Sequence, residues 1–329
     1  MITQEEKEML VPVLLFLVGL VLLIKGGDWF VDGATGIAHQ FHVPELLIGA
    51  TVVSIGTTLP EVMVSATSAV SGHGEIAYGN AIGSIICNTA LIAALTIAVK
   101  PSKVDRKSLK TPVIFFFIAA IYYSFNAYFF KEFSRLTGVI LVIMFLIYMV
   151  MTVMQAKKNP QVSQESDHTE EHYSMVKDLV LLIIGAVLIA FGANLLVNNG
   201  TLIAQAVGVP ESVIALTFVA LGTSLPELVT AITSLVKGHG ALSLGNIIGA
   251  NLFNLVLVSG VSTVLAPFSI PQGKLIAGMN ASLVVDIPVM FLVMMFMTIP
   301  ALIRGKLSRL QGIVLLMIYA AFCIFQFVF

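Results

Sequence analysis

The chain has 329 residues, of which 58% are hydrophobic and only 11% are charged, and its mean hydropathy is +1.00. Because a soluble domain carries roughly 25% charged residues, this composition excludes a soluble domain of ordinary size and predicts that lipid surrounds most of the chain. The formal net charge of -1 gives no sign of a nucleic-acid partner. Cys87 and Cys323 both lie in apolar stretches, so we expect neither a disulfide framework nor a zinc site.

Apolar runs of about 20 residues are the signature of transmembrane helices. The runs in this chain fall at 10–34, 44–71, 75–99, 111–130, 135–155, 175–198, 210–236, 240–266, 277–299 and 308–328. The acidic N-terminus lacks the basic region of a signal peptide, so we expect the first run to be a retained span. Residues 157–174 are polar and rich in charge, which favours a flexible linker. The predicted fold class is therefore an all-α membrane protein with ten transmembrane helices.

Lysine and arginine in the short loops predict the orientation, because basic loops stay in the cytoplasm. With ten spans, twelve of these residues fall on one side and four on the other, and Lys25 lies inside the first span. This count places the 157–174 linker in the cytoplasm and both termini outside.

An internal repeat divides the chain. Residues 49–88 align with 215–254 at an offset of 166 without a gap, and eighteen of the forty positions are identical. The matched segments are GTTLPE with GTSLPE, GHG with GHG, and GNAIGSIICN with GNIIGANLFN. We predict two five-helix halves, 1–156 with a repeat core at 44–99 and 175–329 with a core at 210–266. Five is odd, so the second half enters the membrane from the opposite face, an arrangement found in secondary transporters.

The repeat places an acidic residue near the middle of two predicted spans, Glu61 in the second and Glu227 in the seventh. A charge at that depth costs about 2.5–3.5 kcal/mol on insertion scales, so it persists where something neutralises it. No basic residue lies at comparable depth in the repeat spans, which favours a bound cation or a proton. The alternative is that two protonated glutamates satisfy each other as an interhelical contact.

Further oxygen atoms surround each glutamate in the sequence. Proline lacks an N–H, so Pro60 and Pro226 are expected to free the carbonyls of Gly56 and Gly222. Hydroxyl groups lie next to them, on Thr57, Thr58, Thr223 and Ser224. Ca²⁺ takes about six to eight oxygen ligands, including carboxylates, which two such half-sites can supply.

The third and eighth spans add neutral oxygens. Ser84 lies one turn before Asn88, and Asn254 is the equivalent of Asn88 in the second half. These three side chains are candidate ligands, with interhelical hydrogen bonding as the open alternative. Asn80 and Asn246 follow glycines in the same two spans, where we expect the glycines to serve helix packing.

Other polar residues are given weaker roles. Lys25, Asp28 and Asp32 have helical spacing in the first span, so we expect a salt bridge or snorkelling rather than ion binding. Asp286 has no partner visible in the sequence. His73 and His239 lie in glycine-flanked turns and are expected to be loop residues, with a pH-sensing role left open.

At GTTLPE, GTSLPE and the two Gly-Asn segments, the sequence resembles the calcium/cation antiporter superfamily, specifically the prokaryotic sodium/calcium exchangers. The strong match covers about 80 residues of the repeats. The resemblance implies electrogenic exchange of Na⁺ for Ca²⁺ by alternating access in the plasma (inner) membrane of a prokaryote, with the ions as substrates and no cofactor. It implies that Glu61 and Glu227 bind Ca²⁺ and share in Na⁺ binding, and that Thr57 and Thr223 contribute backbone and side-chain oxygens. It further implies Na⁺ sites lined by Thr58, Ser224, Ser84 and the carbonyls of Ser54 and Ala220.

Two positions depart from the family pattern. Asn254 stands where many members carry Asp, and Ala250 stands where the hydroxyl equivalent to Ser84 is expected. The second half therefore offers fewer anionic and hydroxyl ligands. This leaves the Na⁺ stoichiometry open and keeps H⁺ open as the counter-ion.

Competing functions remain to be weighed. A Ca²⁺/H⁺ antiporter would use the same glutamates as proton carriers. A cation channel usually builds its filter from several chains, whereas this chain has a two-fold repeat. An intramembrane enzyme is not expected, because the sequence has no Ser/His/Asp set, HExxH or P-loop at usable spacing. Nothing in the sequence indicates an obligate protein partner.

Overall fold

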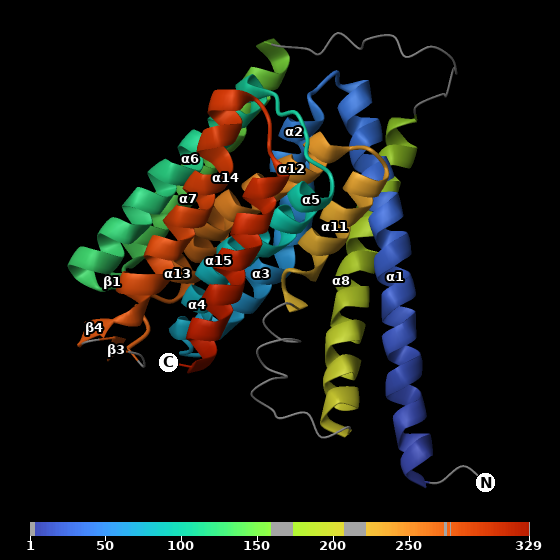
Figure 1. Cartoon of the computed structure of the whole chain (residues 1–329), viewed down its shortest axis with the longest axis horizontal. Helices are drawn as coiled ribbons and strands as arrows, with labels where there is room; N and C mark the ends of the chain where they lie inside the picture. The colour runs from blue at the N-terminus through green and yellow to red at the C-terminus, as the bar shows by residue number, and fades with distance from the viewer. Residues whose placement is uncertain (1–3, 159–173, 207–221, 273–274, 277, 329) are drawn as a thin grey trace.

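The computed structural model describes residues 4–158, 174–206, 222–272, 275–276 and 278–328. These residues are almost entirely helical, which confirms the predicted all-α class. Figure 1 shows a tilted bundle of helices with α1 (Gln4–Gln40) and α8 (Met175–Ala206) standing together along one edge. The start of α1 and the end of α15 (Arg309–Val328) both lie toward the lower part of the bundle in this view.

Each long helix before residue 159 corresponds to one predicted span, and several contain a π-helical stretch, written η. After α1 the elements are α2 (Glu45–Ile48), η1 (Gly49–Val53), α3 (Ser54–Val70), α4 (Gly74–Cys87), η2 (Asn88–Ala93), α5 (Ala94–Val99), α6 (Arg106–Phe125), η3 (Asn126–Phe130), β1 (Glu132–Phe133) and α7 (Arg135–Lys158).

The rest of the chain follows the same plan. After α8 the described elements are α11 (Leu225–Val236), α12 (Gly240–Phe253), η5 (Asn254–Ser259), α13 (Gly260–Leu265), β2 (Phe268–Ser269), β3 (Leu275–Ile276), β4 (Met279–Asn280), η6 (Ser282–Asp286), α14 (Ile287–Arg304) and α15 (Arg309–Val328).

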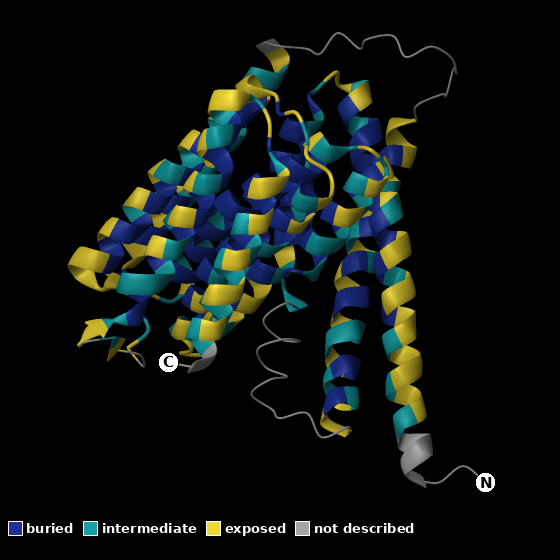
Figure 2. Ribbon diagram, in the orientation of Figure 1, coloured by how far each residue is buried: buried dark blue, intermediate teal, exposed yellow. Residues whose placement is uncertain are grey.

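Nine helices among the described residues are long and apolar enough to cross a membrane. Within the predicted span at 210–236 the structure describes the shorter apolar helix α11, and residues 207–221 lie outside the described part of the chain. Figure 2 shows exposed residues along the outer surfaces of α1 and α7 and buried residues in the middle of the bundle. Exposed apolar side chains such as Leu17 and Val150 suit a lipid-facing surface.

Several predicted boundaries are wrong by a turn or more, and local chemistry explains two of them. The fourth span begins at Arg106 rather than 111, because Asp105 caps the helix by accepting hydrogen bonds from the N–H groups of Lys107 and Ser108 at 3.0 and 3.2 Å. The ninth span runs from Ser282 to Arg304 rather than from 277 to 299. It ends where Gly305 adopts a left-handed conformation, with φ of 65°.

Helices α1 and α8 form a pair that packs backbone against backbone. A Cβ atom on Gly26 would lie 2.9 Å from the backbone nitrogen of Ile189, and one on Gly185 would lie 2.5 Å from that of Phe30. Small residues permit this approach in membranes. Both helices extend beyond the predicted 10–34 and 175–198.

Loops from distant parts of the sequence meet at the two ends of the bundle. At one end the backbones of Lys103 and Lys306 form an isolated antiparallel β-bridge, and Arg309 Nε donates a hydrogen bond to the Ala98 carbonyl at 2.9 Å. At the other end β1 pairs with β2, and the backbone N–H of Gln272 donates to Glu75 Oε1 at 3.3 Å. Each end thus collects alternate loops of the chain, as expected if the long helices cross a membrane in turn.

The main buried core lies among the helices other than α1 and α8. Its aromatic centre stacks Tyr123 on Phe133, with ring centroids 4.3 Å apart, and Tyr148 Oη donates to the Ala50 carbonyl at 2.8 Å. A second cluster, including Phe30, Val53 and Leu182, joins α1 and α8 to η1 and its flanks.

Candidate cation-binding site

The two repeated glutamates lie inside the bundle and interact with each other. Glu61 on α3 and Glu227 on α11 have no exposed surface, and their carboxyl groups are close enough for the charge of one to act on the other. Their four carboxyl oxygens have no hydrogen-bond partner among the described residues. Burying two like charges without compensation is strongly unfavourable, so the pair requires a cation or protons to neutralise it.

The two helices present their glutamates differently. Helix α3 runs through Pro60, as expected, so the proline interrupts the hydrogen-bond ladder beside Glu61. Helix α11 instead begins at Leu225, after Ser224, which puts Pro226 and Glu227 in its first turn. Proline suits the first turn because the N–H it lacks would be unpaired there. The positive end of the helix dipole also favours the Glu227 carboxylate.

Unpaired neutral oxygens occur three residues before each glutamate and on the two π-helices that contact the glutamate helices. The hydroxyls of Thr58 and Ser224 are buried and have no partner in the described structure. Asn254 Nδ2 donates to the Ala250 carbonyl at 3.1 Å, which leaves Oδ1 unpaired among the described atoms. The amide of Asn88 makes no hydrogen bond within the same set.

Both asparagines stand where their helices change to π-helix, a feature common at functional sites. Asn88 begins η2, which contacts α11, and Asn254 begins η5, which contacts α3. The amide of each half is therefore carried on an element that contacts the glutamate helix of the other half.

The predicted threonine ligands form hydrogen bonds that cross between the halves. Thr57 Oγ1 donates to Asn246 Oδ1 at 3.2 Å, and Thr223 Oγ1 donates to Asn80 Oδ1 at 3.1 Å. Thr57 Oγ1 also lies beside the Glu227 carboxyl but outside hydrogen-bonding geometry. The sequence interpretation did not include Asn80 and Asn246 in the site, although the duplicated Gly-Asn pair was a signal for them.

The other predicted site residues are placed as follows. Ser84 is 4% exposed on α4, and Ser54 is fully buried with its hydroxyl directed at the carbonyls of Gly49 and Asn246, at 2.7 and 2.9 Å. Ala220 lies outside the described residues.

Acidic residues away from the pair have other partners. Lys237 Nζ lies 2.8 Å from Asp32 Oδ1 and 3.5 Å from Asp28 Oδ1, so the salt bridge expected for these aspartates forms with Lys237. Gln326 Nε2 donates to Asp286 Oδ1 at 2.9 Å, which supplies a partner that the sequence did not reveal. In the described parts of the chain, no three His, Cys, Asp or Glu side chains come together as a metal-binding group.

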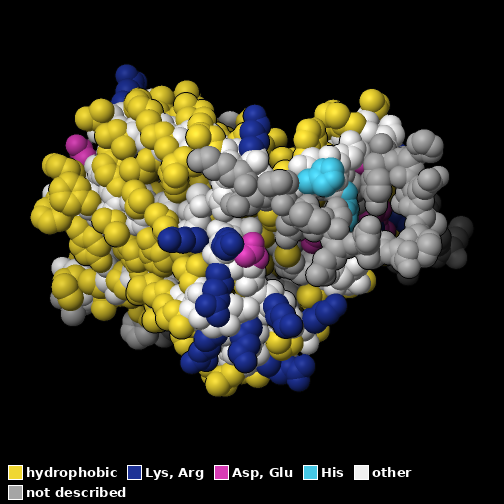
Figure 3. Space-filling model, turned by 90° about the horizontal axis from the view of Figure 1, so that it is seen from above, with side chains coloured by type: hydrophobic (Ala, Val, Ile, Leu, Met, Phe, Trp, Pro, Cys, Tyr) yellow, Lys and Arg dark blue, Asp and Glu magenta, His cyan; other side chains and the backbone are white. Residues whose placement is uncertain are grey.

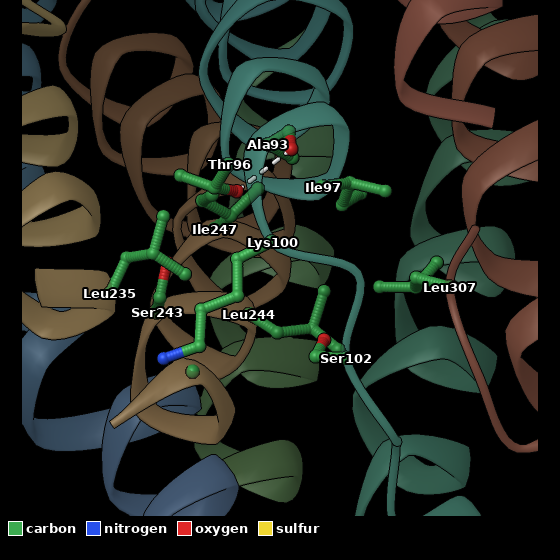
Figure 4. A pocket seen from close by; sticks show the side chains of 11 residues that line it. Ala93, Thr96, Ile97, Lys100, Ser102, Leu235, Ser243, Leu244, Ile247 and Leu307 are labelled. Atoms are coloured by element: carbon green, nitrogen blue, oxygen red, sulfur yellow. Dashed lines mark hydrogen bonds between the residues drawn. The ribbon is translucent and has the colours of Figure 1, made fainter. Parts of the chain in front are cut away.

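Two cavities lie near these elements. A narrow pocket of about 180 Å³ is lined by Thr57, Pro60 and Pro226 on one side and by Phe30 and Ile189 on the other, so it lies where the α1–α8 pair meets the glutamate helices. A second pocket, of about 300 Å³, lies near Lys100, Ser102 and Leu307. Figure 4 shows that the Thr96 hydroxyl there donates a hydrogen bond to the Ala93 carbonyl. No predicted ligand lines the second cavity.

A multi-pass helical bundle that encloses paired carboxylates and unpaired neutral oxygens defines a class of protein, the membrane transporters of cations. Comparison with known proteins narrows this class. The sequence pattern of the family described as sodium/calcium exchanger protein matches residues 11–154 and 177–328. The chain therefore belongs to the sodium/calcium exchanger family, whose members are transporters and not enzymes.

Relatives cover most of the chain. An uncharacterized membrane protein of Methanocaldococcus jannaschii is 40% identical over 73% of this chain and 77% of its own. The sodium/calcium exchanger MaX1 of Methanosarcina acetivorans is 30% identical over 95% and 98%. A structure of the sodium-calcium exchanger NCX_Mj soaked with Na⁺ and Sr²⁺ aligns with a TM-score of 0.79 at 34% identity, covering 95% of this chain and 98% of the other.

Proposed function

We propose that this protein is a secondary antiporter that exchanges Ca²⁺ for Na⁺ across the membrane. The observation that carries the proposal is the fully buried pair of Glu61 and Glu227, whose carboxyl oxygens have no partner among the described side chains. One Ca²⁺, or Na⁺ ions in its place, would neutralise the pair. The family, and the solved NCX_Mj structures soaked with Na⁺, Ca²⁺ or Sr²⁺, support these ions as substrates.

The ligands proposed around the two carboxylates are those of the sequence interpretation, and the unpaired oxygens of Thr58, Ser224, Asn88 and Asn254 support their assignment. Thr57 and Thr223 join them through hydroxyl and backbone oxygens. Ser84 and the Ser54 carbonyl belong to the proposed Na⁺ sites, as does the Ala220 carbonyl, for which the support is the sequence match alone. These are hard oxygen ligands, which suit Na⁺ and Ca²⁺ better than soft metals.

We also propose that ten spans form two inverted halves, 1–156 and 175–329, joined by a linker at 157–174. The reciprocal pairs Thr57–Asn246 and Thr223–Asn80 support this arrangement, because each residue and its partner exchange under the repeat offset of 166. Such halves place the site at the bilayer midplane, where it can open to either side.

For access, α1 and α8 are proposed to slide across the other helices. Their close backbone contact makes them one unit, and the pocket lined by Phe30, Ile189 and Thr57 lies between that unit and the site. A shift of packed helices of this kind is a known route of conformational change.

The orientation proposed has both termini outside and the basic loops in the cytoplasm. Figure 3 shows Lys and Arg side chains gathered on the face seen from above. The contacts of Lys103 with Lys306 and of Arg309 with the Ala98 carbonyl place basic segments together at one end, as the positive-inside rule requires.

A gradient-swap flux assay tests the function. In proteoliposomes loaded with Na⁺ and diluted into Na⁺-free buffer, we expect rapid ⁴⁵Ca²⁺ uptake that collapses when Na⁺ is replaced by choline. A pH gradient of matched size, with no Na⁺ present, should not drive uptake. If the pH gradient alone drives it, the protein is a Ca²⁺/H⁺ antiporter, the alternative that the sequence left open.

A further inference from the structure

The amides of Asn80 on α4 and Asn246 on α12 make equivalent contacts in the two halves. Each accepts a hydrogen bond from a threonine of the other half, Asn246 Oδ1 from Thr57 at 3.2 Å and Asn80 Oδ1 from Thr223 at 3.1 Å. Asn246 and Thr57 are buried, and Asn80 and Thr223 are half-buried. Each amide is thus tied to a hydroxyl four residues before a glutamate.

A hydroxyl can bind a cation only if its proton points elsewhere, because it carries one proton and two lone pairs. An amide oxygen has no proton of its own, so a hydroxyl next to it must donate. The donated bond turns the lone pairs of the threonine oxygen away from the amide. They then become available to an ion held by Glu61 and Glu227.

We propose, on the basis of the Na⁺/Ca²⁺ exchange function above, that Asn80 and Asn246 are positioning residues that fix the Thr223 and Thr57 hydroxyls as cation ligands. Neither amide needs to touch the ion. Each acts through a threonine of the opposite half, so ligand geometry on one side of the site depends on the other half being in place.

The surroundings of each amide hold its oxygen toward the threonine. Asn80 Nδ2 donates to Ser65 Oγ at 2.8 Å and to the Glu61 carbonyl at 3.4 Å, which leaves Oδ1 facing Thr223. In Asn246 the amide oxygen makes the side-chain contacts. Ser54 Oγ also approaches Oδ1, at 3.3 Å, while Nδ2 has no partner among the described residues.

The competing acceptor for Thr57 is weaker. The Ser54 carbonyl, one helical turn earlier, lies 3.4 Å from Thr57 Oγ1, farther than the Asn246 oxygen. Loss of the amide oxygen would free the hydroxyl to turn to this carbonyl or to present its proton to the ion, and either change weakens cation binding.

Double-mutant cycles test the proposal, with equilibrium ⁴⁵Ca²⁺ binding to the purified full chain in detergent as the readout. Asn246→Leu removes the acceptor at similar volume, and Thr57→Val removes the hydroxyl. We expect each single substitution to raise the half-saturating Ca²⁺ about tenfold, the loss of one hydrogen-bonded ligand oxygen. The double variant should be no worse than the single ones, because the amide acts only through the hydroxyl.

Two further arms serve as controls. In a Thr57→Ser background, which keeps a hydroxyl, Asn246→Leu should still raise the half-saturating Ca²⁺ about tenfold. In the mismatched pair, Thr57→Val with Asn80→Leu, the two effects should multiply and raise it about a hundredfold. The Thr223→Val and Asn80→Leu cycle repeats the test in the other half, so a folding failure in one pair, seen as aggregation on size exclusion, leaves the second pair to decide.

Unchanged Ca²⁺ affinity in folded Asn246→Leu and Asn80→Leu would overturn the proposal, as would matched cycles that multiply like the mismatched one. Binding is measured apart from transport. A parent protein that binds Ca²⁺ with these cycles but shows no Na⁺-driven flux would refute the exchange function and leave the positioning role standing. A parent that binds no Ca²⁺ would refute both.

Discussion

Glu61 and Glu227 carry the only fully buried carboxyl groups in the part of the chain that the structure describes. Asp178 is also largely buried, but Gln40 Nε2 donates to its Oδ2 at 2.6 Å. The contrast shows how this protein treats acidic residues. Asp32 is paired with Lys237, whereas the carboxyl oxygens of Glu61 and Glu227 have no partner among the described residues.

The first prediction concerns these two residues. Glu61→Gln or Glu227→Gln should reduce Na⁺-driven ⁴⁵Ca²⁺ uptake at least a hundredfold, because an amide cannot offset the desolvation of a divalent cation, a loss of about 3 kcal/mol or more. Glu132→Gln, at an exposed site on β1, is the matched control and should keep parental uptake. Uptake that survives either site substitution would remove the glutamates from the mechanism.

A second residue-scale prediction uses the asymmetry between the halves. Ala250 is fully buried where the first half has Ser84. Ala250→Ser should lower the half-saturating Na⁺ about two- to tenfold by supplying one more neutral oxygen. Ser84→Ala should raise it by a similar factor. Measuring Na⁺ inhibition of ⁴⁵Ca²⁺ binding checks both signs, and no change in either variant would exclude these positions from the Na⁺ sites.

At the scale of elements, the α1–α8 pair is distinguished by glycines at its contact. Gly19 and Gly26 of α1 face Gly192 and Gly185 of α8 so closely that Cβ atoms added to Gly19 and Gly26 would lie 2.9–3.0 Å from backbone atoms of α8. Closely matched backbones can move as one unit, whereas bulk at the contact changes the angle between the helices.

We therefore predict that Gly26→Ala slows exchange about tenfold, which corresponds to about 1.4 kcal/mol on the conformational barrier, while leaving equilibrium Ca²⁺ binding unchanged. Val21→Leu, on the exposed side of the same helix, is the control and should retain the parental rate. The separation of rate from affinity is the informative result. A loss of binding without a loss of rate would show that the pair supports the site rather than its movement.

A second element-scale contact joins the turn before α12 to the start of α2. His239 Nδ1 lies 2.8 Å from Glu45 Oε1, and this hydrogen bond raises the pKa of His239 above its usual value despite partial burial, with Asp32 adding to the rise and Lys237 opposing it. A raised pKa in the folded state stabilises the fold below about pH 6.5, and this contribution is lost as the pH rises through the raised value.

The melting temperature of His239→Gln should therefore be lower than that of the parent. The difference should be largest near pH 6 and should shrink in alkaline buffer. The difference is expected to be small, on the order of 1 °C, because the pair is partly exposed. Thermal unfolding across this pH range measures it. Glu45→Gln should remove the same pH-dependent component, and a constant difference at all pH values would show that the ion pair contributes nothing.

For the whole molecule, the loop contacts bear on how the chain crosses the membrane. The pairing of β1 with β2 and the bridge between Lys103 and Lys306 lie at opposite ends of the bundle. Alternate loops thus share an end, although residues 207–221 are outside the described structure.

We predict the absolute orientation from the basic loops. In a background with Cys323→Ser, Ser269→Cys on β2 should react with a membrane-impermeant maleimide in intact cells. Ser166→Cys, in the linker, should react only after the membrane is permeabilised. Cys87 is buried and serves as the unlabelled background. The reverse pattern would place the termini in the cytoplasm.

The amino-acid sequence was sufficient for the features that depend on composition and on spacing along the chain. Long apolar runs have few alternatives to membrane helices, so the all-α class and the positions of most spans followed directly. The family followed from the duplicated GT-x-LPE segment, and the comparisons bear it out. Glu61 and Glu227 could be singled out because an acidic residue in an apolar run is costly wherever it lies.

Features that depend on contacts between distant residues required the tertiary structure. The partners of Asp32 and Asp286, the bonds of Asn80 and Asn246 to threonines of the other half, and the π-helical turns at Asn88 and Asn254 have no local signature. Hydropathy along the chain records what each segment prefers as its solvent, and this fixes which segments enter the membrane. Hydrogen-bond partners are set by the three-dimensional packing of the helices, so only the folded bundle decided which polar side chains satisfy one another and which have no partner among the described residues.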